Sequence, residues 1–118
     1  MINHITIAVS NLETSRNFYD ESLMPLGLTR LFSEEGHVGY GKDRPFFWIA
    51  AEEWNSKAHV AFEAMSEEEV KQFHAAAMKA GGTDNGQPGP RPEYHENCFG
   101  AFVLDPDGNN IEAVFGNN

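Results

Sequence analysis

The sequence predicts an α+β fold built from two tandem βαβββ modules. Three pairs of residues recur at a spacing of 55: His4 and His59, Phe18 and Phe73, Gly27 and Gly82. In each half these residues take the same places, which are the first strand, the inner face of a helix and the end of that helix. Two copies are too few for a solenoid, so the repeat indicates one duplicated unit. Mixed sheets with their helices on one side belong to the α+β class.

The first module, residues 1–52, begins with a strand over 2–9, where apolar and β-branched residues predominate. A helix follows, with Asn11 as its N-cap and Gly27 as a left-handed stop. The pattern then predicts three short strands, over 28–34, 37–42 and 45–51. A linker near 52–57 joins the modules.

The second module, residues 57–118, begins with a strand over 58–64. Ser66 and Glu69 form a capping box that opens a helix, and Gly81 and Gly82 close it. We expect the helix to direct Val70, Phe73, Ala77 and Ala80 inward and to leave His74 at the surface.

The rest of this module mixes irregular and regular sequence. Residues 83–97 are rich in Pro, Gly and Asn, which predicts a loop and not a full strand. Strands over 99–104 and 109–115 complete the module. The segment Asp105-Pro106-Asp107-Gly108 between them is a strong turn signal. The two modules together make a single domain.

Composition limits the function classes. The chain has 118 residues, 41% of them apolar, and a net charge of −10, so its surface repels nucleic acids and anionic membranes. No apolar run approaches the roughly 18 residues that cross a bilayer, and the N-terminus lacks the basic leader of a signal peptide. Cys98 is the single cysteine, which favours a reducing compartment. We therefore expect a cytoplasmic protein.

Three residues are candidate metal ligands. His4 and His59 hold equivalent positions in duplicated strands, so both side chains are expected to face one shared cavity. Glu112 lies among apolar residues of the last strand, where a carboxylate is costly to bury unless it is paired or bound to metal. Two imidazoles and one carboxylate make up a facial metal triad. Taken singly, each residue has a simpler interpretation as a surface or hydrogen-bonded side chain.

The two ends of the chain resemble one known family. The segment His4-Ile5-Thr6-Ile7-Ala8-Val9-Ser10-Asn11-Leu12, followed by Ser15-Arg16-Asn17-Phe18-Tyr19, resembles the opening of the vicinal oxygen chelate superfamily. That superfamily includes glyoxalase I, bleomycin-resistance proteins and extradiol dioxygenases. The closing segment Phe102-Val103-Leu104-Asp105-Pro106-Asp107-Gly108-Asn109-Asn110-Ile111-Glu112 is similar to its most recognisable signature.

This resemblance implies a cup-shaped mixed sheet that holds a divalent metal ion, such as Zn, Ni, Mn or Fe. Vicinal oxygens of a substrate would chelate the metal, which would stabilise developing negative charge. By position, His4, His59 and Glu112 match the family's ligands, and Glu112 is also a candidate catalytic group. Family members usually dimerise, so we expect a homodimer, with the site either within one chain or across the dimer.

The sequence departs from the family at one position. The glyoxalase I branch places a fourth, acidic ligand on the last strand of the first module, but residues 45–50 contain no metal-binding side chain. Glu52 and Glu53 follow too late. This departure argues against glyoxalase I activity itself, and a three-ligand site is closer to the dioxygenase and fosfomycin-modifying branches.

The loop over residues 91–98 is a second candidate region. His95 could serve as a fourth ligand or an acid/base group, and Tyr94 as a hydrogen-bond donor to an oxyanion. Arg91 could clamp a carboxylate. A polar loop without a function is an equal alternative. Cys98 has no activating partner besides His95, so a catalytic thiol is not expected.

Three function hypotheses remain open from the sequence. The first is a metal-dependent glyoxalase-like lyase or isomerase, or a related dioxygenase, acting on a small molecule with vicinal oxygens. The second is a metal-free binding protein of the bleomycin-resistance type, whose acidic cleft would hold a cationic ligand. The third is a sensor or structural dimer with a vestigial site. The retained histidine pair favours the first over the second.

Overall fold

The computed structural model describes residues 1–93 and 96–116 and contains two copies of one order of elements. The first comprises β1 (Ile5–Val9), α1 (Leu12–Ser22), a short 3₁₀ helix η1 (Met24–Leu26), β2 (Thr29–Glu34), β3 (His37–Gly41) and β4 (Pro45–Ala51). The second comprises β5 (His59–Glu63), α2 (Glu67–Lys79), β6 (Thr83–Pro90), β7 (Phe99–Leu104) and β8 (Asn110–Phe115). Neither of these α-helices is long and apolar enough to cross a membrane.

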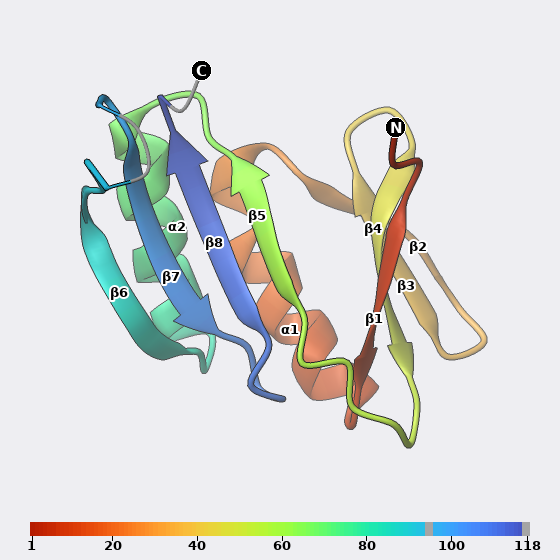
Figure 1. The fold of residues 1–118 in the computed structure, drawn as a ribbon. Coiled ribbons are helices and arrows are strands. Elements are labelled where there is room, and N and C mark those ends of the chain that lie inside the picture. Colours follow the sequence, from red (N-terminus) through yellow and green to blue (C-terminus); the bar gives the residue numbers. More distant parts are fainter. Residues whose placement is uncertain (94–95, 117–118) are drawn as a thin grey trace.

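The strands form two four-stranded sheets, one from each half of the chain (Figure 1). The strand order is β1-β4-β3-β2 in the first sheet and β5-β8-β7-β6 in the second. In each sheet the first strand pairs in parallel with the last, and the other pairs are antiparallel. The identical topology confirms the predicted duplication and the α+β class.

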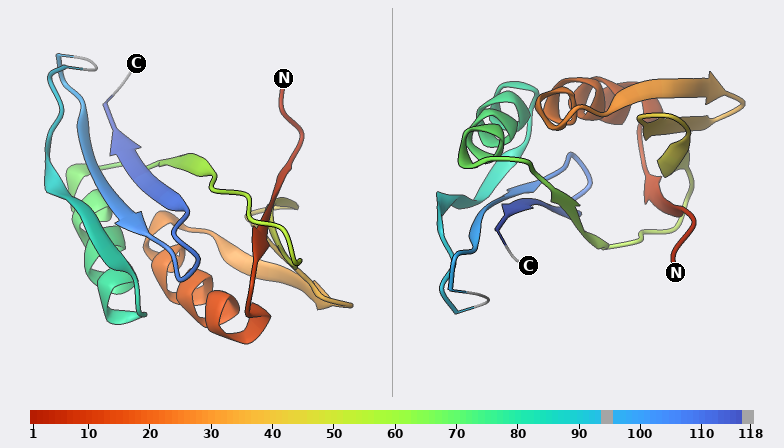
Figure 2. Two further views of the ribbon diagram at one scale, coloured as in Figure 1. Left: turned by 60° about the horizontal axis from the view of Figure 1, so that its bottom comes forward. Right: turned by 90° about the horizontal axis from the view of Figure 1, so that it is seen from above.

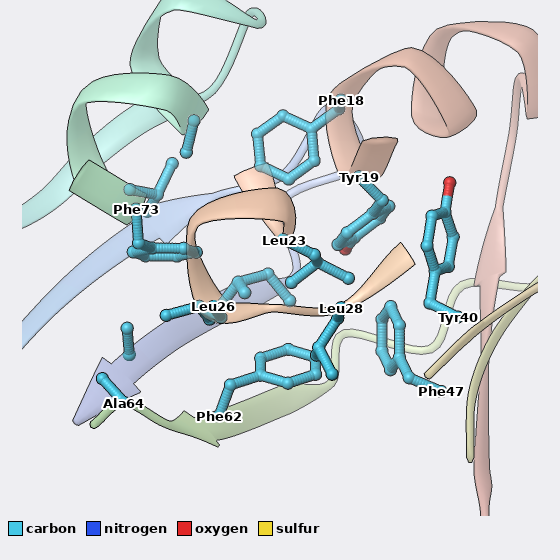
Figure 3. Close-up of a cluster of buried hydrophobic side chains, with 14 of the residues drawn as sticks. Phe18, Tyr19, Leu23, Leu26, Leu28, Tyr40, Phe47, Phe62, Ala64 and Phe73 are labelled. Atoms are coloured by element: carbon cyan, nitrogen blue, oxygen red, sulfur yellow. The ribbon is translucent and has the colours of Figure 1, made fainter. Parts of the chain in front are cut away.

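The helices lie side by side and join the two halves through one core (Figure 2). Phe18 of α1 and Phe73 of α2, the pair predicted from the 55-residue spacing, are both fully buried there (Figure 3). Phe47 of β4 lies 5.1 Å from the ring of Tyr19 and 5.1 Å from the ring of Phe62 in β5. Both are edge-on aromatic contacts, and the one between Phe47 and Phe62 connects the two modules.

Local signals begin both α-helices where the sequence predicts. The Asn11 side chain accepts a hydrogen bond of 3.0 Å from the backbone N–H of Thr14. Ser66 accepts one of 3.1 Å from Glu69, whose own carboxylate reaches back to the N–H of Met65. The first helix ends earlier than predicted, at Ser22, and Gly27 instead ends η1. Its φ of 80° is a left-handed conformation that glycine reaches without a steric cost.

The prediction of a loop from residue 83 onwards was wrong for its first part. Thr83–Pro90 forms strand β6, which pairs with β7 and is interrupted by register shifts around Gly86. A strand rich in Pro and Gly is tolerated here because β6 is the outer strand of its sheet, where missing donors face no neighbour.

The prediction of a surface position for His74 was also wrong. The residue is only 8% exposed, and Nε2 lies 2.8 Å from Oδ1 of Asp84 at the start of β6. Because residue 84 was expected in a loop, no partner for a buried histidine was foreseen. The contact fastens α2 to the edge of the second sheet.

Candidate functional site

The second sheet has one face packed on the helices and one open face, and Glu112 lies on the open one. Its neighbours in β8, Ile111 and Ala113, are fully buried in the core, so the alternation of a strand turns Glu112 the other way. Phe102 of β7 stands opposite Glu112 in the register and shares this face. The open face is therefore the one that carries the predicted acidic group.

His59 and Glu112 lie in direct contact on this face. They come from the parallel neighbours β5 and β8, and Nε2 of His59 is 2.9 Å from Oε1 of Glu112. The glutamate side chain is only 9% exposed, whereas that of the histidine is 55% exposed. The imidazole thus partners a carboxylate that would be costly to bury alone. These are two of the three predicted ligands.

His4 lies elsewhere in the same chain. It precedes β1, and with Ala61, Phe62 and Glu63 it lines a cavity of about 620 Å³ between β1, β4 and β5. His4 is therefore beside the end of β5, whereas His59 begins that strand. In Figure 1, β1 descends from the N-terminus while β5 ascends. Equivalent positions in the two modules thus fall at opposite ends of the adjacent strands.

A single chain consequently brings together two of the predicted ligands and leaves the third apart. No group of three His, Cys, Asp or Glu side chains suited to a metal ion occurs within residues 1–93 and 96–116. Module symmetry relates His4 to His59, but it does not require the two modules of one chain to face each other. The three-ligand metal site remains a prediction.

The open face of the first sheet is aromatic. Trp48 of β4 pairs in register with Thr6, and its ring lies 5.2 Å from that of Phe32 in β2. Its neighbours Phe47 and Ile49 are buried on the opposite, core face. The strand on which a fourth, acidic ligand would stand thus presents an indole instead.

Sequence comparison assigns the chain to a known family. Residues 1–113 match the family model of the Glyoxalase/Bleomycin resistance protein/Dioxygenase superfamily. The chain belongs to this superfamily. Its members commonly use divalent metal ions. No curated protein is significantly similar to the chain in sequence.

Solved structures of the superfamily share the fold over nearly the whole chain. A glyoxalase/bleomycin resistance protein from Albidiferax ferrireducens T118 is 31% identical, with a TM-score of 0.88 over 98% of this chain and 99% of that one. A glyoxalase-related enzyme from Fulvimarina pelagi is 20% identical, with a TM-score of 0.79 over 98% and 88%. Lactoylglutathione lyase from Agrobacterium tumefaciens is 16% identical, with a TM-score of 0.72 over 99% and 94%.

The remaining candidate residues of this superfamily member lie in or next to the loop over residues 91–98. Tyr94 and His95 lie outside the described residues, so their roles remain predictions. Cys98 is buried, and burial, followed by the nearby charge of Glu112, raises the pKa of its thiol above the usual value. A protonated, enclosed thiol is a poor nucleophile, as expected from the sequence.

Phe102 is a site residue that the sequence reading missed. Its ring lies 6.0 Å from the His59 ring and 5.6 Å from the guanidinium carbon of Arg91. The signal was available in principle, because Phe102 alternates with the buried Ala101 and Val103 along β7. The position of Phe102 opposite Glu112 depends on the pairing of β7 with β8, which the sequence does not show.

Proposed function

We propose that this protein is a divalent-metal-dependent enzyme, a glyoxalase-like lyase or isomerase or a related dioxygenase, acting on a small molecule with vicinal oxygens. The observation that carries the proposal is the contact of 2.9 Å between His59 and Glu112 on the open face of the second sheet. A nearly buried carboxylate and an imidazole that converge on one point are a donor pair suited to Zn, Ni, Mn or Fe.

The donor set fits a metal ion if a second copy of the chain supplies the third ligand. We propose that His59 and Glu112 of one protomer are joined by His4 of its partner in a homodimer. His4 is exposed and bonded only to the adjacent Asn3 among the described residues, so it is accessible to another chain. The metal supplies Lewis-acid polarisation of substrate oxygens when bound.

The protein's own groups would handle the proton and exclude water. Glu112 presents two oxygens, one facing His59, and a carboxylate in this position can accept a proton from a substrate carbon. Phe102 shields the glutamate from the open side of β7. Tyr94 and His95, which follow Glu93 in the sequence, are proposed to donate a hydrogen bond or a proton to a developing oxyanion.

The alternative is a metal-free binding protein of the bleomycin-resistance type. The net charge of −10 is the observation that favours it, since an acidic surface attracts a cationic ligand. The two proposals differ in the use of the His59–Glu112 pair. A sequestering protein needs no metal donors, whereas the enzyme loses its metal when either donor is removed.

Metal titration by calorimetry distinguishes the two. The wild-type protein should bind Ni²⁺, Zn²⁺, Mn²⁺ or Fe²⁺, and His59→Ala and Glu112→Gln should each weaken binding by more than about 100-fold. His37→Ala is the matched control, because His37 is exposed on β3 and its ring has a hydrogen bond only with a backbone carbonyl among the described residues. Equal metal affinity of the wild type and His59→Ala would exclude the enzyme proposal.

A further inference from the structure

The Arg91 side chain lies on the open face of the second sheet, next to Gly86, Gly89 and Gly100. A Cβ atom added at Gly86 or Gly89 would lie 3.4 Å from the terminal guanidinium nitrogens, and one added at Gly100 would lie 3.8 Å from Cγ. The backbone N–H of Arg91 donates a hydrogen bond of 2.7 Å to the carbonyl of Cys98. The Arg91 side chain therefore runs within van der Waals distance of three positions that carry no side chain of their own.

The guanidinium is positioned by neutral groups. Nη2 donates a hydrogen bond of 2.6 Å to the carbonyl of Gln87, Nη1 one of 3.1 Å to that of Pro90, and the group lies over the Phe102 ring. Within residues 1–93 and 96–116 no carboxylate forms an ion pair with it. An arginine has five N–H donors and a permanent charge, so donors and charge remain for a ligand.

This cation adjoins the His59–Glu112 pair. A Cβ on Gly100 would be 3.8 Å from Oε2 of Glu112 as well as from Cγ of Arg91, so the two side chains flank one glycine. Phe102 lies between them on the sheet surface, next to both the guanidinium and the His59 ring. A ligand beside Phe102 would thus have a carboxylate and an imidazole on one side and the positive charge of Arg91 on the other.

We infer that Arg91 and Phe102 form a subsite for the carboxylate of the substrate, which makes the substrate a small carboxylic acid. The planar fork of a guanidinium matches a carboxylate, and the adjoining ring accepts the flat or apolar part of the molecule. A monoanion is favoured over a phosphate dianion, because the net charge of −10 repels the dianion more strongly. The orientation of vicinal oxygens toward His59 and Glu112 rests on the proposed function, whereas the anion subsite does not.

The first experiment tests the anion subsite without metal. Benzoate and its uncharged isostere benzamide are titrated into the metal-free protein, and the amide signals of Gly86, Gly89 and Gly100 are followed by NMR. The dissociation constant obtained from these shifts should be at least about 10-fold lower for benzoate than for benzamide. This difference corresponds to the free energy of one charged hydrogen-bonded contact. Arg91→Gln should remove the difference, and Arg91→Lys, which keeps the charge without the fork, should keep part of it.

Lys71→Gln is the matched control for charge. Lys71 also lies over a ring of β7, at 5.9 Å from the centroid of Phe99, but it belongs to α2. Its removal should leave benzoate binding unchanged. Equal binding of benzoate and benzamide by the wild type, an unchanged preference in Arg91→Gln, or tighter binding of inorganic phosphate than of benzoate would overturn the carboxylate subsite.

The second experiment separates this inference from the proposed metal site. Acetohydroxamate chelates metal through vicinal oxygens, and succinic monohydroxamate adds a carboxylate to the same group. On Mn²⁺-loaded protein, succinic monohydroxamate should bind about 10-fold more tightly than acetohydroxamate. Arg91→Gln should lower the affinity for succinic monohydroxamate to that for acetohydroxamate. If neither hydroxamate binds while benzoate still prefers Arg91, the metal proposal fails and the anion subsite stands. If both hydroxamates bind equally to the wild type, the orientation toward the metal donors is wrong.

Discussion

The phenol of Tyr19 in α1 donates a hydrogen bond of 2.5 Å to the carboxylate of Asp105, 86 residues further along the chain. Both groups are buried, and Asp105 opens the turn between β7 and β8. The carboxylate also accepts hydrogen bonds from the backbone of Asp107 and from the backbone and side chain of Asn109. The signature turn of the second module thus holds the helix of the first.

We predict that Tyr19→Phe destabilises the protein by about 1.5–3 kcal/mol, because a buried carboxylate loses one of its donors. Burial, together with the charge of Asp105, raises the pKa of Tyr19, so its hydroxyl stays protonated and remains a donor at neutral pH. Urea unfolding measures the change. Tyr40→Phe is the control, since its hydroxyl contacts the partly exposed Asp20 within one module. A loss no larger than that of Tyr40→Phe would contradict the role of this contact.

The His74–Asp84 contact should make stability depend on pH in the acid range. The hydrogen bond from His74, followed by that from the N–H of Gly86, lowers the pKa of Asp84. A carboxyl with a pKa below its unfolded value of about 3.9 stabilises the fold above that value and loses this effect as the pH falls through the folded pKa. Asp84→Asn should therefore be less stable than the wild type at pH 7, with the difference shrinking below about pH 4.

Melting temperatures of both proteins from pH 7 to pH 3 test this. Glu53→Gln is the control, because it removes the same charge from an exposed residue after β4. The difference in melting temperature between Glu53→Gln and the wild type should not shrink as the pH falls. A constant difference between Asp84→Asn and the wild type at every pH would show that the carboxylate is not the titrating group.

The regular elements were predictable because their signals are local. A continuous run of apolar residues defines β4, and the cap at Asn11 defines the start of α1, each from a few adjacent positions. Strand β6 carries no such pattern, since its Pro and Gly residues are held in the sheet by pairing with β7. A strand that exists because of its neighbour is not visible in its own residues.

The candidate site divides along the same line. The spacing of 55 residues related His4 to His59 correctly as a repeat, and Glu112 was singled out by its apolar surroundings. The contact of Glu112 with His59 depends on the register of β5 and β8, and the separation of His4 depends on how two modules pack. Both are long-range properties, as is the burial of His74 against β6.

Gly39 should be required for the position of Trp48 on the open face of the first sheet. A Cβ atom at residue 39 would lie 2.9 Å from the indole ring, closer than side chains pack. Gly39→Ala should therefore displace the ring, change its fluorescence in a Trp54→Phe background and cost about 1–3 kcal/mol. Gly36→Ala is the control for the fluorescence change. Its positive φ strains the backbone at residue 36, but an added Cβ has no atom within 4 Å, so the Trp48 spectrum should not change. An unchanged Trp48 spectrum in Gly39→Ala would mean that the ring has other room.

A site shared between protomers predicts complementation between damaged chains. His4→Ala and Glu112→Gln should each lose tight metal binding as homodimers. In a co-purified heterodimer of the two variants, one site pairs the intact His4 of one chain with the intact His59 and Glu112 of the other. Calorimetry should then find one tight site per dimer, with an affinity within about 3-fold of the wild type, a margin of less than 1 kcal/mol.

The control heterodimer combines His59→Ala with Glu112→Gln. These residues contact each other within one chain, so each site of this dimer lacks one donor and no intact site can form. It should bind metal as weakly as its parents. If the His4→Ala and Glu112→Gln pair is equally weak, or if the protein is a monomer by light scattering, His4 does not complete the site from a partner chain. The separation of His4 from His59 within one chain makes this the decisive comparison, because a site within one chain cannot be rescued by exchange.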